Sequence, residues 1–123
     1  MAAWDRAWHT KDAEALTDVY ASEVVFRSHP FRSTQDPVDY ARGAFVEEGD
    51  ELDLWWGEPI TGDDRAVVEW WAVLTENGEL VTLTGASLLA FGPDGRVVDQ
   101  HDYWVTRAGR VEPWPGWGAS SAA

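Results

Sequence analysis

The chain has 123 residues, enough for one domain, and 45% of them are hydrophobic, which is too many for a disordered chain. Its formal net charge of −13 repels phosphate backbones and anionic membranes, so neither nucleic acid nor a membrane is an expected partner. The chain contains no cysteine, which excludes disulfides and thiolate chemistry. It has neither the apolar run of a signal peptide nor an apolar stretch of about 20 residues, the length that spans a membrane, so we expect a cytoplasmic protein.

Two short helices are predicted at the start of the chain. Trp4 and Trp8 are four residues apart, and this spacing places both indoles on one face of a helix over residues 2–9. Asp12 opens a second predicted helix. This helix is expected to continue to about Ala21, because apolar residues recur in it at helical spacing.

A strand and a third helix are predicted next. Residues 24–28 are rich in β-branched and aromatic side chains, which favour a strand, and Pro30 ends it. Asp36 and Pro37 are typical of a helix start, as the N-cap and the first helical residue. Gly49 is the predicted end of this helix.

The rest of the chain is predicted to form a meander of antiparallel strands. Asn77-Gly78 is a strong signal for a two-residue hairpin, and residues 61–64 and 92–95 also have turn-forming sequences. Helices followed by strands are typical of an α+β fold in which the helices pack on one face of the sheet. The predicted strands are residues 51–58, 65–75, 79–91 and 96–106.

The C-terminal segment is not expected to form a regular element. Residues 112–118 read EPWPGWG, and their prolines and glycines disfavour both a helix and a strand. Residues 1–118 are therefore predicted to form a single domain, and residues 119–123 a frayed tail.

Nine tryptophans exceed what a core of this size needs, so some are expected to line a cavity or an interface, unless they only fill space. Neighbouring residues of a strand point to opposite faces of a sheet, so the pairs Trp55-Trp56 and Trp70-Trp71 supply indoles to both faces. One set is expected to line a pocket and the other to form the face of a homodimer.

Asp102 is the candidate catalytic residue, because it is a carboxylate in an otherwise apolar and aromatic strand. Strand alternation places Gln100 and Trp104 on its side of the strand, and His101 and Tyr103 on the other side. A carboxylate walled by tryptophan has a raised pKa and can act as a general base or acid near neutral pH. The alternative is a structural carboxylate that pairs with an arginine or caps the backbone.

The order of elements resembles that of a known family. The helix–Asp–helix opening at residues 8–20, the segment VVFRSHPF at residues 24–31 and the closing GRVVDQHDYWV at residues 95–105 are similar to the SnoaL-like branch of the nuclear transport factor 2-like superfamily, which includes polyketide cyclases. The resemblance covers about residues 4–106. It implies a homodimer and a cone-shaped α+β barrel, in which three N-terminal helices pack on a strongly bent antiparallel sheet around a deep pocket.

The resemblance also bears on the reaction. In the epoxide hydrolase branch the last strand carries an Asp that acts in the pocket, and Asp102 matches it. That branch also needs an Arg and an Asp on an earlier strand, where this chain has Trp70 and Ala72. The residues that match the three catalytic positions of the ketosteroid isomerase branch are Trp4, Ser87 and Ser28. Neither chemistry is therefore expected in its family form.

Two further residues are candidates for the site. By resemblance, His29 lies at the mouth of the pocket, where it could form an acid–base pair with Asp102; otherwise it is a turn histidine before proline. Glu69 is either a second catalytic carboxylate or a buried partner of Arg27. The predicted ligand-binding residues are Phe26, Ser28, Glu69, Trp70, Ser87, Gln100 and Trp104.

These features predict a cofactor-independent enzyme of the cyclase, isomerase or dehydratase type that acts on a small apolar cyclic molecule, with Asp102 and His29 as its catalytic residues. No histidine spacing suits a metal, and no phosphate-binding loop or serine-hydrolase motif occurs, so neither a metal nor a cofactor is expected. The alternative prediction is a non-catalytic module of the same fold, which binds a hydrophobic ligand or acts as a dimeric partner.

Overall fold

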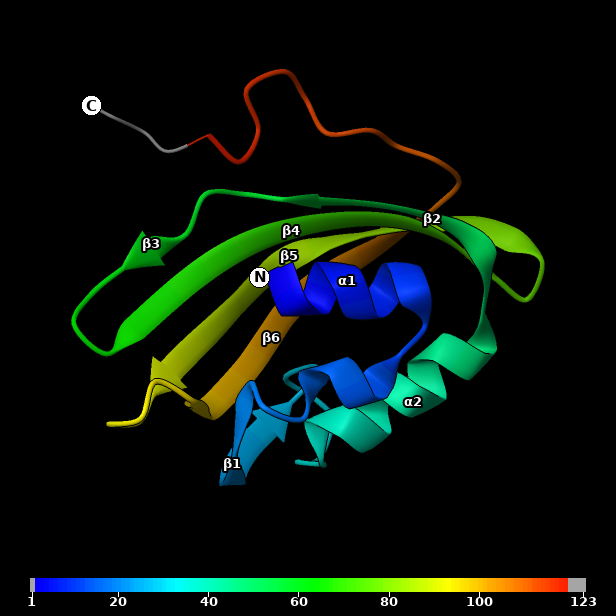
Figure 1. The fold of residues 1–123 in the computed structure, drawn as a ribbon. Helices are drawn as coiled ribbons and strands as arrows, with labels where there is room; N and C mark the ends of the chain where they lie inside the picture. The colour runs from blue at the N-terminus through cyan, green and yellow to red at the C-terminus, as the bar shows by residue number, and fades with distance from the viewer. Residues whose placement is uncertain (1, 120–123) are drawn as a thin grey trace.

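A strongly curved sheet of six strands forms the frame of the protein, and two helices pack on its concave side (Figure 1). The computed structural model describes the backbone of residues 2–119 and the side chains of residues 3–45 and 53–119. Neither helix in this part of the chain is long and apolar enough to cross a membrane. The elements in chain order are α1 (Ala2–Thr10), the 3-10 helix η1 (Ala13–Leu16), β1 (Tyr20–Arg27), α2 (Pro37–Glu47), β2 (Glu48–Trp56), β3 (Ile60–Thr61), β4 (Arg65–Glu76), β5 (Glu79–Phe91) and β6 (Val97–Ala108).

The predicted α+β fold is confirmed, and two of its local signals are visible in the structure. Asp36 caps α2, because its side chain accepts the backbone N–H of Asp39 at 2.9 Å. Asn77 and Gly78 connect β4 to β5 with φ angles of 54° and 81°, as a two-residue hairpin turn requires.

The predicted second helix, residues 12–21, is wrong. The chain makes only the short η1 turn, with Asp12 as its N-cap, and β1 already begins at Tyr20. Tyr20, one of the apolar residues at helical spacing, lies instead at the start of a strand, where it pairs with Val97 of β6 and its ring is buried. Pairing within the sheet overrides the local helical pattern here.

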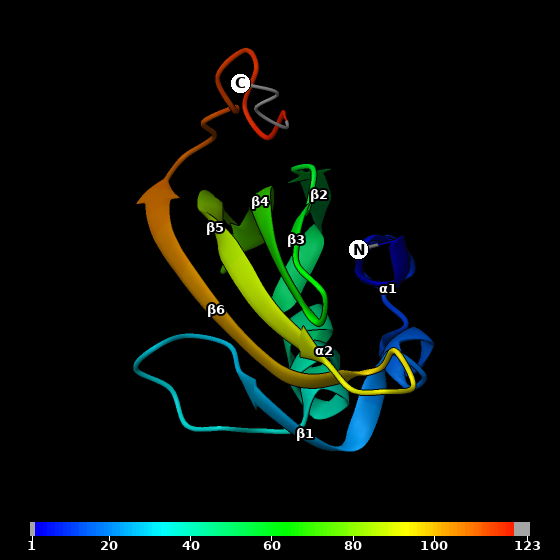
Figure 2. The same ribbon diagram turned by 90° about the vertical axis from the view of Figure 1, so that its left-hand side faces the viewer.

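The sheet has the order β1-β6-β5-β4-β2, with β3 paired to β4, and it stays open at its ends rather than closing into a barrel (Figure 2). All pairs are antiparallel except β1 and β6, which run parallel. The expected purely antiparallel sheet is therefore a mixed one. This exception joins the first strand to the last, so β1 lies beside the strand that carries Asp102.

Gly85 allows β5 and β6 to approach closely in the middle of the sheet. It is the register partner of Trp70 on β4 and of Trp104 on β6. A Cβ atom at Gly85 would lie 1.9 Å from the carbonyl oxygen of Tyr103 and 2.6 Å from the Cα of Trp104. Only glycine fits this position, because backbone atoms of β6 fill the space that a side chain would need.

The main hydrophobic core lies between the helices and β1. Phe26 is fully buried there, and its ring centroid lies 6.2 Å from that of Tyr20 and 5.4 Å from that of Tyr40. Leu16 of η1 and Phe45 of α2 belong to the same cluster. This packing fixes the helices on the concave side of the sheet, where α1 lies over the strands (Figure 1).

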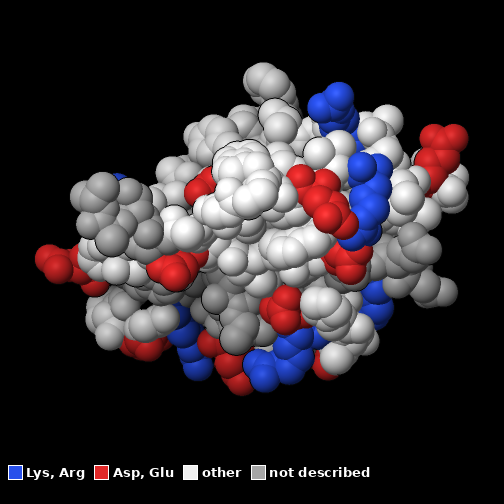
Figure 3. Space-filling model, turned by 90° about the horizontal axis from the view of Figure 1, so that it is seen from above, with Lys and Arg blue, Asp and Glu red and all other residues white. Residues whose placement is uncertain are grey.

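The C-terminal segment crosses the convex side of the sheet and covers Trp71. The indole N–H of Trp71 donates to the carbonyl of Val111 at 2.7 Å, and the rings of Trp114 and Trp117 both lie 5.8 Å from its ring. Uncharged surface fills much of this side (Figure 3). Trp71, one of the two convex tryptophans of the predicted dimer face, is thus covered by the chain itself, and the homodimer stays a prediction.

We expect Gly85→Ala to lower the free energy of unfolding by about 1–3 kcal/mol, the usual cost of overpacking, because its Cβ meets backbone atoms that cannot swing aside. Chemical denaturation measures the change. Gly43→Ala is the matched control: Gly43 lies within α2 with nothing within 4 Å of an added Cβ, so alanine there should raise stability by about 0.5–1 kcal/mol. Equal effects at the two positions would contradict the close approach at Gly85.

Candidate functional site

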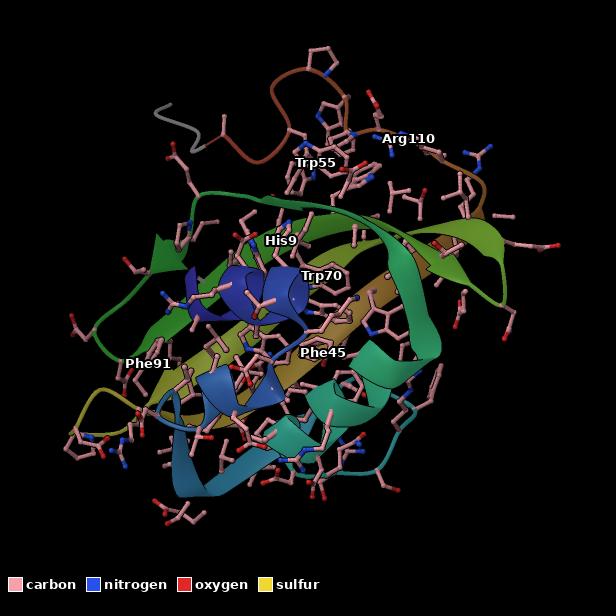
Figure 4. The ribbon with its side chains drawn as sticks, turned by 45° about the vertical axis from the view of Figure 1, so that its right-hand side comes forward. His9, Phe45, Trp55, Trp70, Phe91 and Arg110 are labelled. Atoms are coloured by element: carbon pink, nitrogen blue, oxygen red, sulfur yellow. The ribbon has the colours of Figure 1, made fainter. Side chains whose placement is uncertain are left out.

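A cavity of about 80 Å³ lies between the two helices and the concave face of the sheet. This is several times the roughly 15 Å³ that one water needs, so the cavity has room for a small organic group. Figure 4 shows the Trp70 side chain on the helix side of the sheet, whereas Trp55 and Arg110 lie on the other side. The residues that line the cavity are Trp4, Trp8, Tyr40, Leu54, Trp56, Trp70, Ala72, Leu74, Leu83, Ser87, Gln100, Asp102 and Trp104.

The register of the sheet arranges this lining in rows. Ser87 and Asp102 are register partners and form a polar row. In the next row Gly85 separates Trp70 from Trp104. The row beyond it is aliphatic: Ala72 on β4 lies between Leu54 on β2 and Leu83 on β5. The cavity lining is therefore polar at the carboxylate of Asp102, aromatic in the middle and aliphatic at the far end.

A chain of hydrogen bonds from α1 to β6 holds the carboxylate of Asp102. The indole N–H of Trp4 donates to the hydroxyl of Tyr20 at 2.6 Å, and this hydroxyl donates to the Oε1 atom of Gln100 at 2.5 Å. The Nε2 atom of Gln100 then donates to Asp102 at 3.1 Å. An indole N–H can only donate, so each donor in the chain points toward the carboxylate.

Burial raises the pKa of Asp102 from 3.8 to about 6. Hydrogen bonds from Ser87 and Gln100 and the nearby His101 act in the opposite direction, since all three favour the charged form. Burial also raises the pKa of Tyr20 well above its ordinary value, so its hydroxyl stays protonated and keeps donating to Gln100. Asp102 can therefore hold or release a proton close to neutral pH.

The indole N–H groups of four cavity tryptophans are directed to protein acceptors. Trp4 donates to Tyr20, as described above. The indole N–H of Trp56 donates to Asp5 at 3.1 Å, and the indole N–H of Trp70 donates to Ser87 at 3.1 Å. That of Trp104 donates to the carbonyl of Ser28. These bonds fix the ring planes and leave ring carbon surface to form the wall of the cavity.

Five of the predicted site residues meet at this cavity: Trp70, Ser87, Gln100, Asp102 and Trp104. The predicted alternation of β6 is confirmed. Gln100, Asp102 and Trp104 line the cavity, whereas His101 and Tyr103 do not. A second hollow is lined by His101 and Tyr103 and also touches Gln100 and Asp102.

The predicted pairing of His29 with Asp102 is not formed. His29 follows β1, and its Nδ1 atom accepts the backbone N–H of Phe31 at 3.2 Å. Its ring packs edge-on against Trp104, with the centroids 4.7 Å apart. No hydrogen bond or ion pair joins His29 to Asp102 within the described residues, so His29 acts here as a support for Trp104.

Three predicted ligand-binding residues do not line the cavity. Phe26 and Ser28 are both fully buried behind it, where Ser28 holds the indole of Trp104 and accepts a hydrogen bond from Arg32 at 3.0 Å. Glu69 is exposed and makes no ion pair with Arg27 in the described structure. Alternation explains the error, because Glu69 shares the convex face with Trp71.

The helices contribute cavity residues to which the sequence analysis gave no ligand-binding role. Trp4 and Trp8 point into the cavity from one face of α1, as their spacing in a helix implies, and Tyr40 does so from α2. Trp56 is the register partner of Trp70, so its position follows from strand alternation. Tyr20 was missed because its segment was predicted to be helical. No group of three or more His, Asp or Glu that could hold a metal ion occurs among the residues described.

Comparisons with known proteins agree with this geometry. A family model described as a SnoaL-like domain matches residues 1–100. The epoxide hydrolase/cyclase-like enzyme SalBIII, with a role in pyran ring formation in the polyether salinomycin, has a similar structure, with a TM-score of 0.74 and 13% identity over 88% of this chain and 92% of that chain. No curated protein matches the chain in sequence.

Two other solved structures share the fold. An NTF2-like protein of unknown function from Burkholderia pseudomallei K96243 has a TM-score of 0.66 and 25% identity, over 81% of this chain and 83% of that chain. An LEH-like epoxide hydrolase from M. tuberculosis has a TM-score of 0.68 and 14% identity, over 85% of this chain and 78% of that chain. The fold is therefore that of a group of small domains that includes enzymes.

We expect Asp102→Asn to stabilise the protein above about pH 6, the raised pKa of this carboxyl. A carboxyl whose pKa is raised on folding adds stability below its unfolded pKa, and that stability is lost as pH rises through the folded pKa. The rise from 3.8 to about 6 corresponds to at most about 3 kcal/mol at high pH. Denaturation of both proteins at pH 4 and pH 8 measures the difference. The assignment fails if the variant gains as much stability at pH 4 as at pH 8.

Proposed function

The chain belongs to the SnoaL-like domain family, and from that premise we propose that it is a cofactor-independent enzyme of the cyclase, isomerase or dehydratase type. Its substrate is a small, largely apolar molecule that binds in the tryptophan-lined cavity. Asp102 is the proton-transfer residue. The observation that carries this proposal is the buried carboxylate with a pKa of about 6, held at the polar end of an otherwise aromatic and aliphatic cavity.

The proposed step is proton transfer at a carbon next to a carbonyl. In its ionised form Asp102 accepts the proton, and it returns the proton to another atom of the same substrate, so the residue is regenerated. Gln100 and Ser87 hold the carboxylate in place during both transfers, since each hydrogen-bonds to it. Trp70 and Trp104 both line the cavity, and their indoles offer surfaces on which a flat ring of the substrate can stack.

Relatives of the same fold support small-molecule chemistry as the class of reaction. SalBIII has a role in pyran ring formation, and the M. tuberculosis protein is an LEH-like epoxide hydrolase. The present chain has Trp70 and Ala72 where the epoxide hydrolase branch is expected to carry an Arg and an Asp, so ring opening by that mechanism is not proposed.

A non-catalytic binding module is the second candidate, and one observation favours it. Ser87 and Gln100, the polar neighbours of Asp102 in the cavity lining, both hydrogen-bond to Asp102 itself. A second polar group that acts on the substrate independently would argue for an enzyme. The same cavity could instead bind a hydrophobic ligand without converting it.

Nuclear magnetic resonance titration of the Asp102 carboxyl tests the proposed role directly. We expect a midpoint near 6, and we expect hydrophobic carbonyl compounds that enter the cavity to move it. Compounds that move the midpoint are then incubated with the wild type and with Asp102→Asn. Conversion by the wild type alone supports proton transfer, whereas binding without conversion by either protein favours the binding module. A midpoint near 4, the ordinary value, that no compound moves would contradict both.

The role of Gln100 can be tested in the same experiment. Its amide stabilises the ionised form of Asp102, so Gln100→Leu should raise the Asp102 midpoint above that of the wild type. Arg96→Leu, an exposed change on the same hairpin, is the control and should leave the midpoint unchanged. An unchanged midpoint in Gln100→Leu would show that the amide does not hold the carboxylate.

A further inference from the structure

The carboxylate of Asp102 forms no ion pair within the described residues, although the nearby His101 on the same strand favours its charged form. No Lys, Arg or His is among the described residues that line the cavity, and none of the ion pairs in this part of the chain includes Asp102. Gln100 and Ser87 hydrogen-bond to the carboxylate but carry no positive charge. A buried negative charge is costly unless an opposite charge accompanies it, and a ligand could supply that charge.

Ring faces and aliphatic side chains form most of the cavity walls, and Tyr40, Ser87, Gln100 and Asp102 supply the polar groups. The indole N–H groups of Trp4, Trp56, Trp70 and Trp104 already donate to protein oxygens. Their ring faces carry the negative side of the aromatic quadrupole, which attracts a cation. An enclosure of indole rings with one carboxylate therefore matches a positively charged group.

The fold already uses indole rings of this cavity to hold cations. The Nζ atom of Lys11 lies 5.4 Å from the ring centroid of Trp8, and the guanidinium of Arg32 lies 5.3 Å from that of Trp104. Neither Lys11 nor Arg32 lines the cavity, whereas Trp8 and Trp104 do, so both indoles also present ring surface to the cavity.

The rows of the sheet define where each part of such a ligand would lie. The carboxylate of Asp102 and the indoles of Trp70 and Trp104 occupy neighbouring rows, and the aliphatic row with Leu83 follows. A cationic head at the first two rows thus has an apolar surface next to it for an attached hydrocarbon body.

We propose that the cavity recognises a molecule that carries a quaternary or protonated amine on an apolar body, with the amine beside Asp102 and against the indoles of Trp70 and Trp104. This inference rests on the proposed use of the cavity as the substrate site and names the substrate class. The net charge of −13 also favours the approach of cations over anions.

The test compares choline with 3,3-dimethylbutan-1-ol, in which a neutral carbon replaces the ammonium nitrogen at nearly the same size. Calorimetry at pH 8, where Asp102 is ionised, should show choline binding at least about tenfold more tightly than the alcohol, since a desolvated cation–ring contact and a carboxylate act together. Asp102→Asn should remove this preference and leave the weak binding of the alcohol unchanged.

Asp99→Asn is the matched control, because it removes one negative charge from the same strand and Asp99 does not line the tryptophan-lined cavity, although it lines a second hollow. It should leave the preference for choline intact. The inference is overturned if the alcohol binds as tightly as choline, if choline shows no binding at millimolar concentration, or if Asp99→Asn weakens choline binding as much as Asp102→Asn does. In that last case the attraction is a general effect of the net charge.

The outcomes separate this inference from the proposed function. If neutral carbonyl compounds move the Asp102 titration and are converted while choline fails to bind, the amine class is wrong and the enzyme stands. If choline binds with the expected preference and no compound is converted, the ligand class stands and the proton-transfer role fails. The folding of Asp102→Asn is checked by circular dichroism. Because this variant is expected to be more stable than the wild type at pH 8, a loss of choline binding by the folded variant reports the loss of the charge.

Discussion

The hydrogen bond between Tyr20 and Gln100 connects the parts of the molecule on which the site depends. This hydrogen bond joins β1 to β6, the parallel pair of the sheet. The hydroxyl of Tyr20 also accepts a hydrogen bond from the indole N–H of Trp4 on α1. Gln100 in turn holds Asp102. The position of the helix above the sheet and the orientation of the carboxylate are therefore set by one continuous chain of donors.

This arrangement keeps a carboxylate in surroundings that disfavour its charge. Burial raises the pKa of Asp102, while Gln100 and Ser87 limit the rise and keep the group in one place. A group of this kind lowers the stability of the folded protein at neutral pH, and such costs are typical of sites that have a function. Both the proton-transfer proposal and the amine-binding proposal use the same property, namely a buried carboxylate that forms no ion pair within the described residues.

The tryptophans divide between the two faces of the sheet according to strand alternation. Trp56 and Trp70 form part of the cavity, while their neighbours Trp55 and Trp71 lie on the convex side under the C-terminal segment. Gly85 lies in register between Trp70 and Trp104, which both line the cavity. An unusual number of tryptophans thus has two local explanations: one set forms a cavity wall, and the other anchors the chain terminus.

The sequence by itself determined the fold class, most strand positions, the α2 cap at Asp36, the hairpin at Asn77-Gly78 and the cavity side of β6. These features depend on local chemistry and on the two-residue period of a strand, both of which can be read from neighbouring residues. For the same reason the exposure of Glu69 could have been predicted from its place beside Trp70.

Only the tertiary structure decided which distant residues meet. It placed Tyr20 in a strand through pairing with β6, directed His29 to Trp104 instead of Asp102, and covered Trp71 with the C-terminal segment. These outcomes depend on contacts between residues far apart in the chain. Their energies arise from burial and from hydrogen bonds that form only when the elements are packed, so no local pattern in the sequence reports them.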